Sequence, residues 1–157
     1  MSKIIGHQGF PAFDNFHCHC ALNVTFTDKS CEQAFNIMKD KIELWHPEPG
    51  ANGSYKIWDA VEEEQIWATR TTPTKGYVDD ILFDYFGDPK DFEKKGCSVS
   101  SKSRSQTLSF YDYHTNYCNM WNVLNEVEKD ADLLGDAIEV SDCKWAPKDP
   151  ATTCAKY

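Results

Sequence analysis

The sequence predicts an α+β fold, in which a curved antiparallel sheet has two helices packed on one face and is stabilised by disulfide bonds. Two segments have apolar residues at helical spacing, and the runs between them are β-branched or aromatic with a spacing of about two. No alternation of strand and helix typical of a parallel sheet occurs. The length of 157 residues predicts a single domain over residues 1–157.

The N-terminal part predicts an irregular arm, then a strand and a helix. Glycine, proline and scattered aromatic residues favour the arm over residues 1–20, and the first strand is expected around Cys20–Phe26. Asp28 is a suitable N-cap for the helix, which residues 47–50 would end with two prolines and a glycine. Its apolar stripe consists of Cys31, Ala34, Phe35, Met38, Ile42 and Trp45.

Four strands and a second helix are expected next. The strand-like runs are Tyr55–Ile57, Gln65–Thr69, Tyr77–Phe86 and Cys97–Gln106. In the last of them, Val99, Ser101, Ser103 and Ser105 would share one face with Cys97. Thr115 or Asn116 can cap the second helix. Its stripe consists of Tyr117, Met120, Trp121, Leu124 and Val127.

The C-terminal tail, residues 141–157, contains a segment with prolines, residues 145–153, that shows little regular structure of its own. Such a segment stays ordered only when it is tied to the domain. We therefore expect Cys143 or Cys154, or both, to be bridged, either to each other or back to the domain.

Cysteine usage predicts secretion or residence in an organelle lumen. The seven candidates for disulfides are Cys18, Cys20, Cys31, Cys97, Cys118, Cys143 and Cys154. No CxxC pair occurs, and glycosylation sequons begin at Asn23 and Asn52. An odd count implies three bridges with one thiol left over, or an intermolecular bond, and the pairing stays open.

The segment His17-Cys18-His19-Cys20 combines zinc and copper ligands, so a metal site is one interpretation of it. In an extended chain the two histidines face one way and the two cysteines the other, and no second ligand pair follows at zinc-finger spacing. These residues therefore favour a disulfide through at least one of the two cysteines. No metal and no other cofactor is expected.

The charge and hydropathy of the chain limit the classes of partner that it can bind. A formal net charge of −9 repels nucleic-acid backbones and anionic lipid, so no nucleic acid is expected. No apolar stretch has the roughly 20 residues that a spanning helix needs. The expected partners are a small apolar molecule or another protein, with a homo-oligomer as a further use of the odd cysteine.

Two adjacent aspartates in the third strand-like run, Asp79 and Asp80, must point to opposite faces of the sheet. One of them should be partly buried, and a buried carboxylate needs a charged or multiply hydrogen-bonded neighbour. Arg104 in the next run is a candidate for that role. A salt bridge that organises the sheet and a pair that anchors a ligand are the two interpretations.

Three motifs in residues 77–122 resemble a widespread family of small domains of unknown function found in bacteria and photosynthetic eukaryotes. They are Tyr77-Val78-Asp79-Asp80-Ile81, Lys102-Ser103-Arg104-Ser105-Gln106 and Asp112-x-x-x-Asn116 before a helix. The family pattern has an aromatic-Val-Asp-Asp strand, an Arg-Ser-x-Ser-Arg strand and an Asp-x-Gly-x-Asn turn. Here Lys102 and Gln106 replace its arginines, His114 replaces its glycine, and one extra residue separates the second strand from the turn.

We predict a secreted or lumenal, non-enzymatic protein that binds a small apolar or aromatic ligand or a protein partner. The 13% aromatic content favours a concavity lined by rings under the helices. The candidate ligand-binding residues are Asp79, Arg104, Trp67, Tyr85 and Tyr111. The alternatives are a structural subunit, or a small enzyme that uses Asp112 and His114 with Ser109 or Cys118 as nucleophile.

Overall fold

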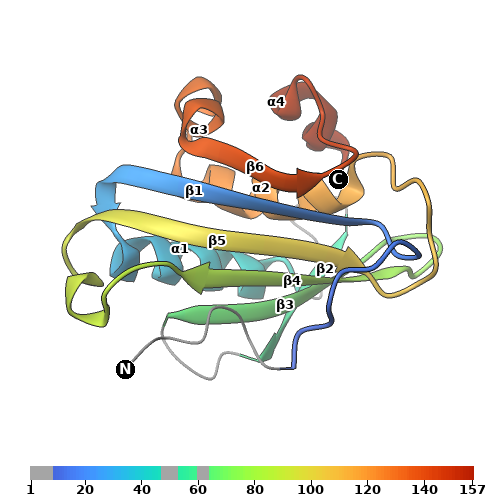
Figure 1. Cartoon of the computed structure of the whole chain (residues 1–157), viewed down its shortest axis with the longest axis horizontal. Coiled ribbons are helices and arrows are strands. Elements are labelled where there is room, and N and C mark those ends of the chain that lie inside the picture. Colours follow the sequence, from blue (N-terminus) through green and yellow to red (C-terminus); the bar gives the residue numbers. More distant parts are fainter. Residues whose placement is uncertain (1–8, 47–52, 60–63) are drawn as a thin grey trace.

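The computed structural model describes residues 9–46, 53–59 and 64–157. An open antiparallel sheet of six strands, in the order β2-β3-β4-β5-β1-β6, forms its centre (Figure 1). The strands are β1 (His19–Ser30), β2 (Ser54–Asp59), β3 (Gln65–Thr71), β4 (Val78–Tyr85), β5 (Lys95–Ser105) and β6 (Ile138–Cys143). The helices are α1 (Cys31–Leu44), α2 (Thr115–Val127), α3 (Ala131–Ala137) and α4 (Pro150–Thr153), with 3-10 turns η1 (Pro89–Asp91) and η2 (Cys154–Lys156).

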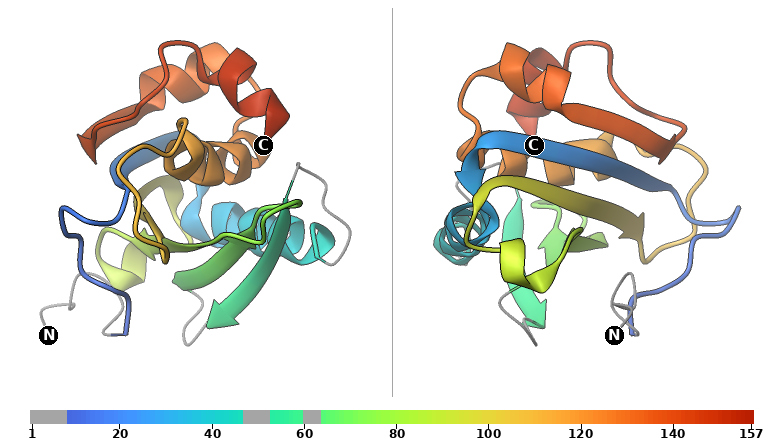
Figure 2. Two further views of the ribbon diagram at one scale, coloured as in Figure 1. Left: turned by 90° about the vertical axis from the view of Figure 1, so that its right-hand side faces the viewer. Right: turned by 60° about the vertical axis from the view of Figure 1, so that its left-hand side comes forward.

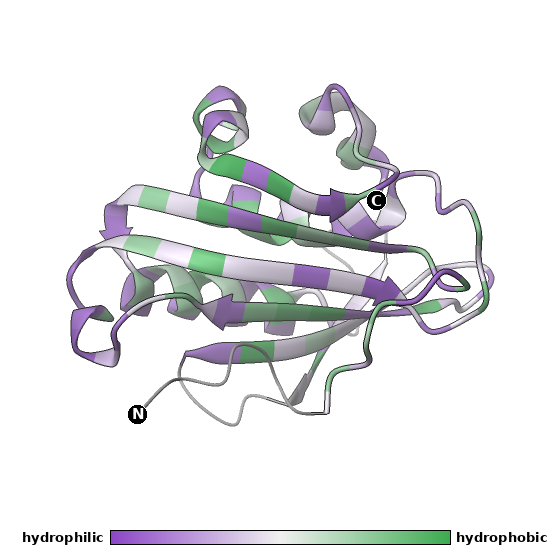
Figure 3. Ribbon diagram, in the orientation of Figure 1, coloured by the Kyte–Doolittle hydropathy of each residue, from purple (hydrophilic) through white to green (hydrophobic). Residues whose placement is uncertain are grey.

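Helices α1 and α2 pack on one face of the curved sheet (Figure 2). The predicted fold class is therefore confirmed. Apolar residues alternate with polar ones along much of β1 (Figure 3), and the buried residues of α1 form an apolar stripe. The two helices and the inward side chains of the strands share one hydrophobic core, which reaches from Cys20 to Cys154 along the chain.

Helix α1 begins later than the sequence suggested. Ser30 is its N-cap, and a capping box forms because the Ser30 hydroxyl accepts from the Gln33 N–H while the Gln33 side chain accepts from the Ser30 N–H. The predicted cap, Asp28, is wrong because β1 continues through it to Ser30.

The outer face of the sheet is partly covered by the irregular arm, described from residue 9 to 18. Phe10 packs edge-on against Trp67, with ring centroids 5.6 Å apart, and Phe13 stacks on His19 at 4.2 Å. Strand β4 is buried along both faces, and Leu82 on its outer side lies opposite Trp67, the ring that Phe10 contacts.

The segment before α2 has an unusual backbone. Tyr113 and His114 have φ angles of 54° and 71°, in the left-handed region that side chains other than glycine rarely adopt. His114 occupies the N-cap position without a side-chain cap. The cap comes instead from Asp112, whose carboxylate accepts from the backbone N–H groups of His114 at 3.0 Å and Asn116 at 3.1 Å.

All seven cysteines lie among the described residues. Six of them form the three bridges Cys20–Cys143, Cys31–Cys97 and Cys118–Cys154, and Cys18 is a buried free thiol. Both tail cysteines are thus bridged back to the domain, as one of the two expected alternatives had it. The segment of residues 145–153, expected to show little regular structure, contains one short helix, α4, at its end, and β6 before this segment pairs with β1. No helix of the described segments is long and apolar enough to cross a membrane.

Candidate ligand-binding site

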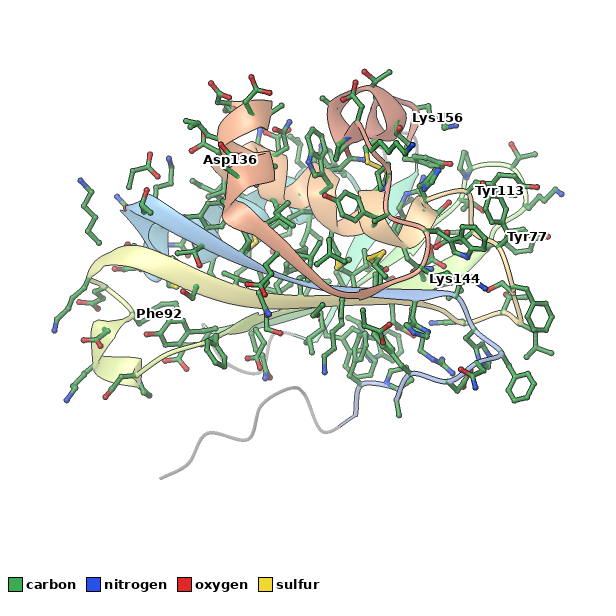
Figure 4. The ribbon with its side chains drawn as sticks, turned by 45° about the horizontal axis from the view of Figure 1, so that its top comes forward. Tyr77, Phe92, Tyr113, Asp136, Lys144 and Lys156 are labelled. Atoms are coloured by element: carbon green, nitrogen blue, oxygen red, sulfur yellow. A yellow bond between two sulfur atoms is a disulfide. The ribbon has the colours of Figure 1, made fainter. Side chains whose placement is uncertain are left out.

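A cavity of about 490 Å³ opens at one end of the sheet. Its wall comes from the hairpin between β3 and β4, the end of β5, the loop of residues 106–114, and the start of α2. Tyr77 and Tyr113 lie at this end of the molecule, whereas Phe92 lies at the opposite end (Figure 4). The volume falls in the range of small-molecule sites.

The rim of the cavity is apolar and exposed. Its large side chains are Tyr77, Leu108, Phe110, Tyr111 and Tyr113, with exposed fractions between 43% and 71%. Exposed apolar groups scattered singly over a surface are ordinary, but a cluster of five around one cavity indicates a contact surface for a ligand or partner.

The inner wall is polar, and Asp79 is its most buried charged group. This side chain is only 4% exposed. The Asn119 amide donates to its Oδ2 at 2.8 Å, and Ser105 hydrogen-bonds to the same carboxyl. Burial nevertheless raises the pKa of Asp79, and the nearby negative charge of Asp112 adds to this, while the hydrogen bonds and Arg70 oppose it.

Two asparagines of α2 connect the cavity wall to the sheet. Asn116 Nδ2 lies 2.9 Å from Asp112 Oδ2 and 3.0 Å from Ser105 Oγ, and Asn116 Oδ1 accepts from the Ser103 hydroxyl at 2.7 Å. Asn119 Nδ2 also lies 3.1 Å from Ser103 Oγ. Buried networks of this kind hold their members in fixed positions because each lost bond would leave a desolvated polar group.

Beside Asp79 lies a fully buried arginine. The register of β3 and β4 places Arg70 directly opposite Asp79, and the register of β2 and β3 places Tyr55 on its other side. Arg70 is 1% exposed, and a Cβ on Gly53 would lie 2.5 Å from its Nε, so a larger residue at position 53 would displace the guanidinium. The Tyr157 ring lies under the guanidinium, with its centroid 5.6 Å from Cζ.

The C-terminal tail supports the rim. Tyr111 packs edge-on against both Tyr113 and Trp145, at centroid distances of 4.4 Å and 4.3 Å. The Tyr157 hydroxyl donates to the Tyr113 carbonyl, and His114 Nδ1 lies 2.6 Å from the Trp145 carbonyl. These contacts hold the left-handed backbone of Tyr113 and His114, and strained backbone of this kind is common at functional sites.

The predicted ligand-binding residues separate into three places. Asp79 and Tyr111 line the cavity. Trp67 and Arg104 lie on the outer face of the sheet, where Trp67 Nε1 donates to Asp80 at 3.0 Å. Tyr85 lies at the far end of β4 and donates its hydroxyl to the Asp88 carbonyl.

The expected pairing of Arg104 with an aspartate of β4 is wrong. Arg104 instead donates to Asp14 of the arm at 3.1 Å. Asp79 cannot reach it because the strand alternation places Asp79 on the helix face, opposite Ser105. Asp80 is opposite Arg104 but accepts from Trp67 and from Gln106, at 3.0 Å and 3.2 Å.

The residues of the enzyme alternative have other partners. The Asp112 carboxylate caps α2, and His114 faces the Trp145 carbonyl. Ser109 accepts from the Cys18 N–H at 3.0 Å, and Cys118 is disulfide-bonded. Within the described segments, no group of three or more His, Cys, Asp or Glu side chains is arranged to hold a metal ion.

Several residues of the site were not singled out from the sequence. Asn119 and Arg70 carried no motif, although Arg70 alternates with the buried Ile66 and Ala68. The one usable signal was the alternation of serines in β5, which predicted a shared face for Ser103 and Ser105. That face is the one against which the asparagines of α2 lie.

No protein-family model matches this chain, and no curated protein sequence matches it either. The resemblance over residues 77–122 therefore stays a prediction. The class of protein is defined here by the fold and the cavity: a disulfide-bonded α+β domain with an open, ring-lined pocket at one end of its sheet.

Proposed function

We propose that this protein is a secreted or lumenal, non-enzymatic binding protein for a small apolar or aromatic ligand, held in the cavity at the end of the sheet. The observation that carries the proposal is the composition of the cavity wall. An exposed aromatic rim surrounds a small number of fixed polar groups. Small-molecule sites commonly have this composition, in which apolar side chains provide most of the contact and a few polar groups orient the ligand.

The disulfides and the sequons support a secreted or lumenal location. Three bridges in one small chain are typical of proteins that fold in an oxidising environment. The side chain of Asn23 is exposed on β1, so this sequon is accessible in the folded chain. Asn52, the other sequon, lies outside the described residues.

Binding is favoured over catalysis by the way the polar groups are used. The amides of Asn116 and Asn119 fix the carboxylates of the cavity by hydrogen bonds, and the Ser105 hydroxyl bonds to one of these carboxylates, that of Asp79. Six cysteines are disulfide-bonded, and the thiol of Cys18 is buried. Burial raises the pKa of the Cys18 thiol, which keeps it protonated and weakly nucleophilic.

The test is a titration with N-phenyl-1-naphthylamine, an uncharged dye whose fluorescence rises in apolar sites. We expect saturable binding of one dye per chain, and Tyr77→Ala should weaken it about tenfold, as truncation of a central aromatic contact does. The matched control is Phe86→Ala, because Tyr77 and Phe86 flank the two ends of β4 with exposed fractions of 50% and 59%. Arg104→Met, on the outer face, is a second control.

Both controls should bind the dye within about twofold of the unaltered protein. If the dye does not saturate, or if Phe86→Ala weakens binding as much as Tyr77→Ala, the cavity is not the binding site. A protein partner on the same rim is the other outcome. It would leave dye binding weak while Phe110→Ala, which removes a side chain that is 71% exposed, abolishes capture of that partner.

A further inference from the structure

We infer that the cavity selects ligands that carry a cationic amine or quaternary ammonium group beside an apolar body. This inference rests on the proposed function and specifies the chemical class of its ligand. It is carried by three observations: the rings of the rim, an ammonium group of the chain that already lies over one of them, and the carboxylates of the inner wall.

The rim is suited to hold a cation. Tyr77, Phe110, Tyr111 and Tyr113 belong to one cavity wall. Aromatic faces carry partial negative charge, and groups of rings are the common protein device for binding quaternary ammonium. Lys75 supplies an internal example, because its Nζ lies 6.0 Å from the centroid of the Tyr77 ring.

The charges of the wall favour a cation as well. Two carboxylates and one ammonium, those of Asp79, Asp112 and Lys75, line the cavity. The Asp112 oxygens already accept backbone and amide hydrogens, so Asp112 acts as a fixed charge. Asp79 is the anchor, because a carboxylate has about four acceptor positions and its two known donors leave some of them for a ligand.

The buried arginine does not reverse this preference. Arg70 lies beside Asp79 on the neighbouring strand and is not part of the cavity wall. A ligand in the cavity therefore contacts the carboxylate and not the guanidinium. The net charge of −9 adds a long-range attraction for cations over anions.

Cation binding should depend on pH. The groups around Asp79 are Arg70 from β3, Tyr55 from β2, Asp112 before α2 and Cys18 before β1. Burial favours the neutral form of the Asp79 carboxyl, whereas a bound cation favours the ionised form. Binding of a permanent cation should therefore release a proton and weaken as the pH falls through the raised pKa of Asp79.

The experiment compares two probes of nearly equal shape, benzyltrimethylammonium and its uncharged carbon isostere neopentylbenzene, by displacement of N-phenyl-1-naphthylamine. We expect the cation to bind at least about tenfold more tightly than the isostere. Asp79→Asn should reduce this ratio to about twofold or less, with the affinity of neopentylbenzene unchanged. Thermal melting of the variant verifies that it is folded.

A second variant avoids the buried network. Lys75 is exposed at the rim, so Lys75→Gln removes a competing ammonium and should raise the affinity of the cation about threefold without affecting the isostere. The matched control is Lys95→Gln, an exposed lysine at the start of β5, where no change is expected.

The outcomes separate the two proposals. If neopentylbenzene binds as tightly as the cation, the cavity binds apolar ligands and the inference about charge is wrong. If neither probe displaces the dye and the dye itself does not saturate, both the proposed function and the inference fail. If Asp79→Asn is folded and keeps the full preference for the cation, Asp79 is not the anchor and the inference is also overturned.

Discussion

Removing the bridge between Cys118 and Cys154, by changing both to alanine, should destabilise the protein by about 4 kcal/mol. This bridge ties α2 to the turn η2 across a sequence separation of 36 residues. The chain-entropy relation gives that value because the unfolded chain gains the freedom of a loop of this length. The native contacts of the tail remain, so the loss arises mainly in the unfolded state.

The other two bridges provide a check on this reasoning. Their sequence separations are 66 for Cys31–Cys97 and 123 for Cys20–Cys143. In each case the remaining bridges shorten the connecting path to about 45 residues, so each removal should also cost about 4 kcal/mol. Equal losses are thus expected despite unequal separations along the chain.

The assay is equilibrium unfolding in guanidinium chloride, with the denaturant midpoint and slope measured for each double variant. Dye binding provides a second readout, because Tyr157 and Trp145 of the tail support the rim of the cavity. The Cys118→Ala, Cys154→Ala protein should bind the dye more weakly while it is still folded. A loss below about 1 kcal/mol, or losses that rise with the separations 36, 66 and 123, would refute the reasoning.

Three further predictions concern single residues. Thiol titration without reductant should find one reactive thiol per chain in denaturant, that of Cys18, and almost none in the native state because the thiol is buried; six or seven free thiols in native material would contradict the bridges. Trp121→Ala, in the core, should cost about 3 to 5 kcal/mol, whereas Trp58→Ala, 63% exposed, should cost under about 0.5 kcal/mol by thermal melting. Asp79→Asn should change stability in a pH-dependent way. The folded pKa of Asp79 is raised, so its favourable contribution is complete below the unfolded pKa of about 3.9 and is lost as the pH rises through the folded value. The free energy of unfolding of the variant should therefore rise relative to that of the unaltered protein as the pH increases above about 4. Asn119 Oδ1, which has no hydrogen-bond partner among the described residues, adds to this gain. A difference that stays constant with pH would contradict the raised pKa of Asp79.

Local patterns in the sequence were sufficient to predict the two long helices, because the signal for a helix lies within the helix itself. The stripes of α1 and α2 were readable because their buried positions, such as Phe35 and Leu124, repeat at helical spacing. The cap of α1 was misplaced because Asp28 and Ser30 are both good caps, and only the length of β1 decides between them. Strand ends depend on pairing with distant segments, which a single sequence does not display.

The site itself was only partly predictable for the same reason. Asp79 was predicted because one of two adjacent aspartates in a strand should be partly buried, and Tyr111 because it is aromatic. Both line the cavity. Trp67 and Tyr85 have the same chemical character but lie elsewhere, because the face and the end of the sheet follow from register. Arg70 was missed since arginine in a strand is ordinarily exposed, and its burial depends on Gly53 and other non-local neighbours.

The bridge between Cys20 and Cys143 also determines which strand forms an edge of the sheet. Strand β6 is short, mostly exposed and carries acidic residues, features that discourage a second molecule from adding a strand there. If reduction releases β6, the new edge is β1, a strand of twelve residues with alternating apolar side chains. Expression in a reducing cytoplasm should therefore yield aggregates held together by intermolecular strand pairing, and the yield of monomer should follow the oxidation of this one bond.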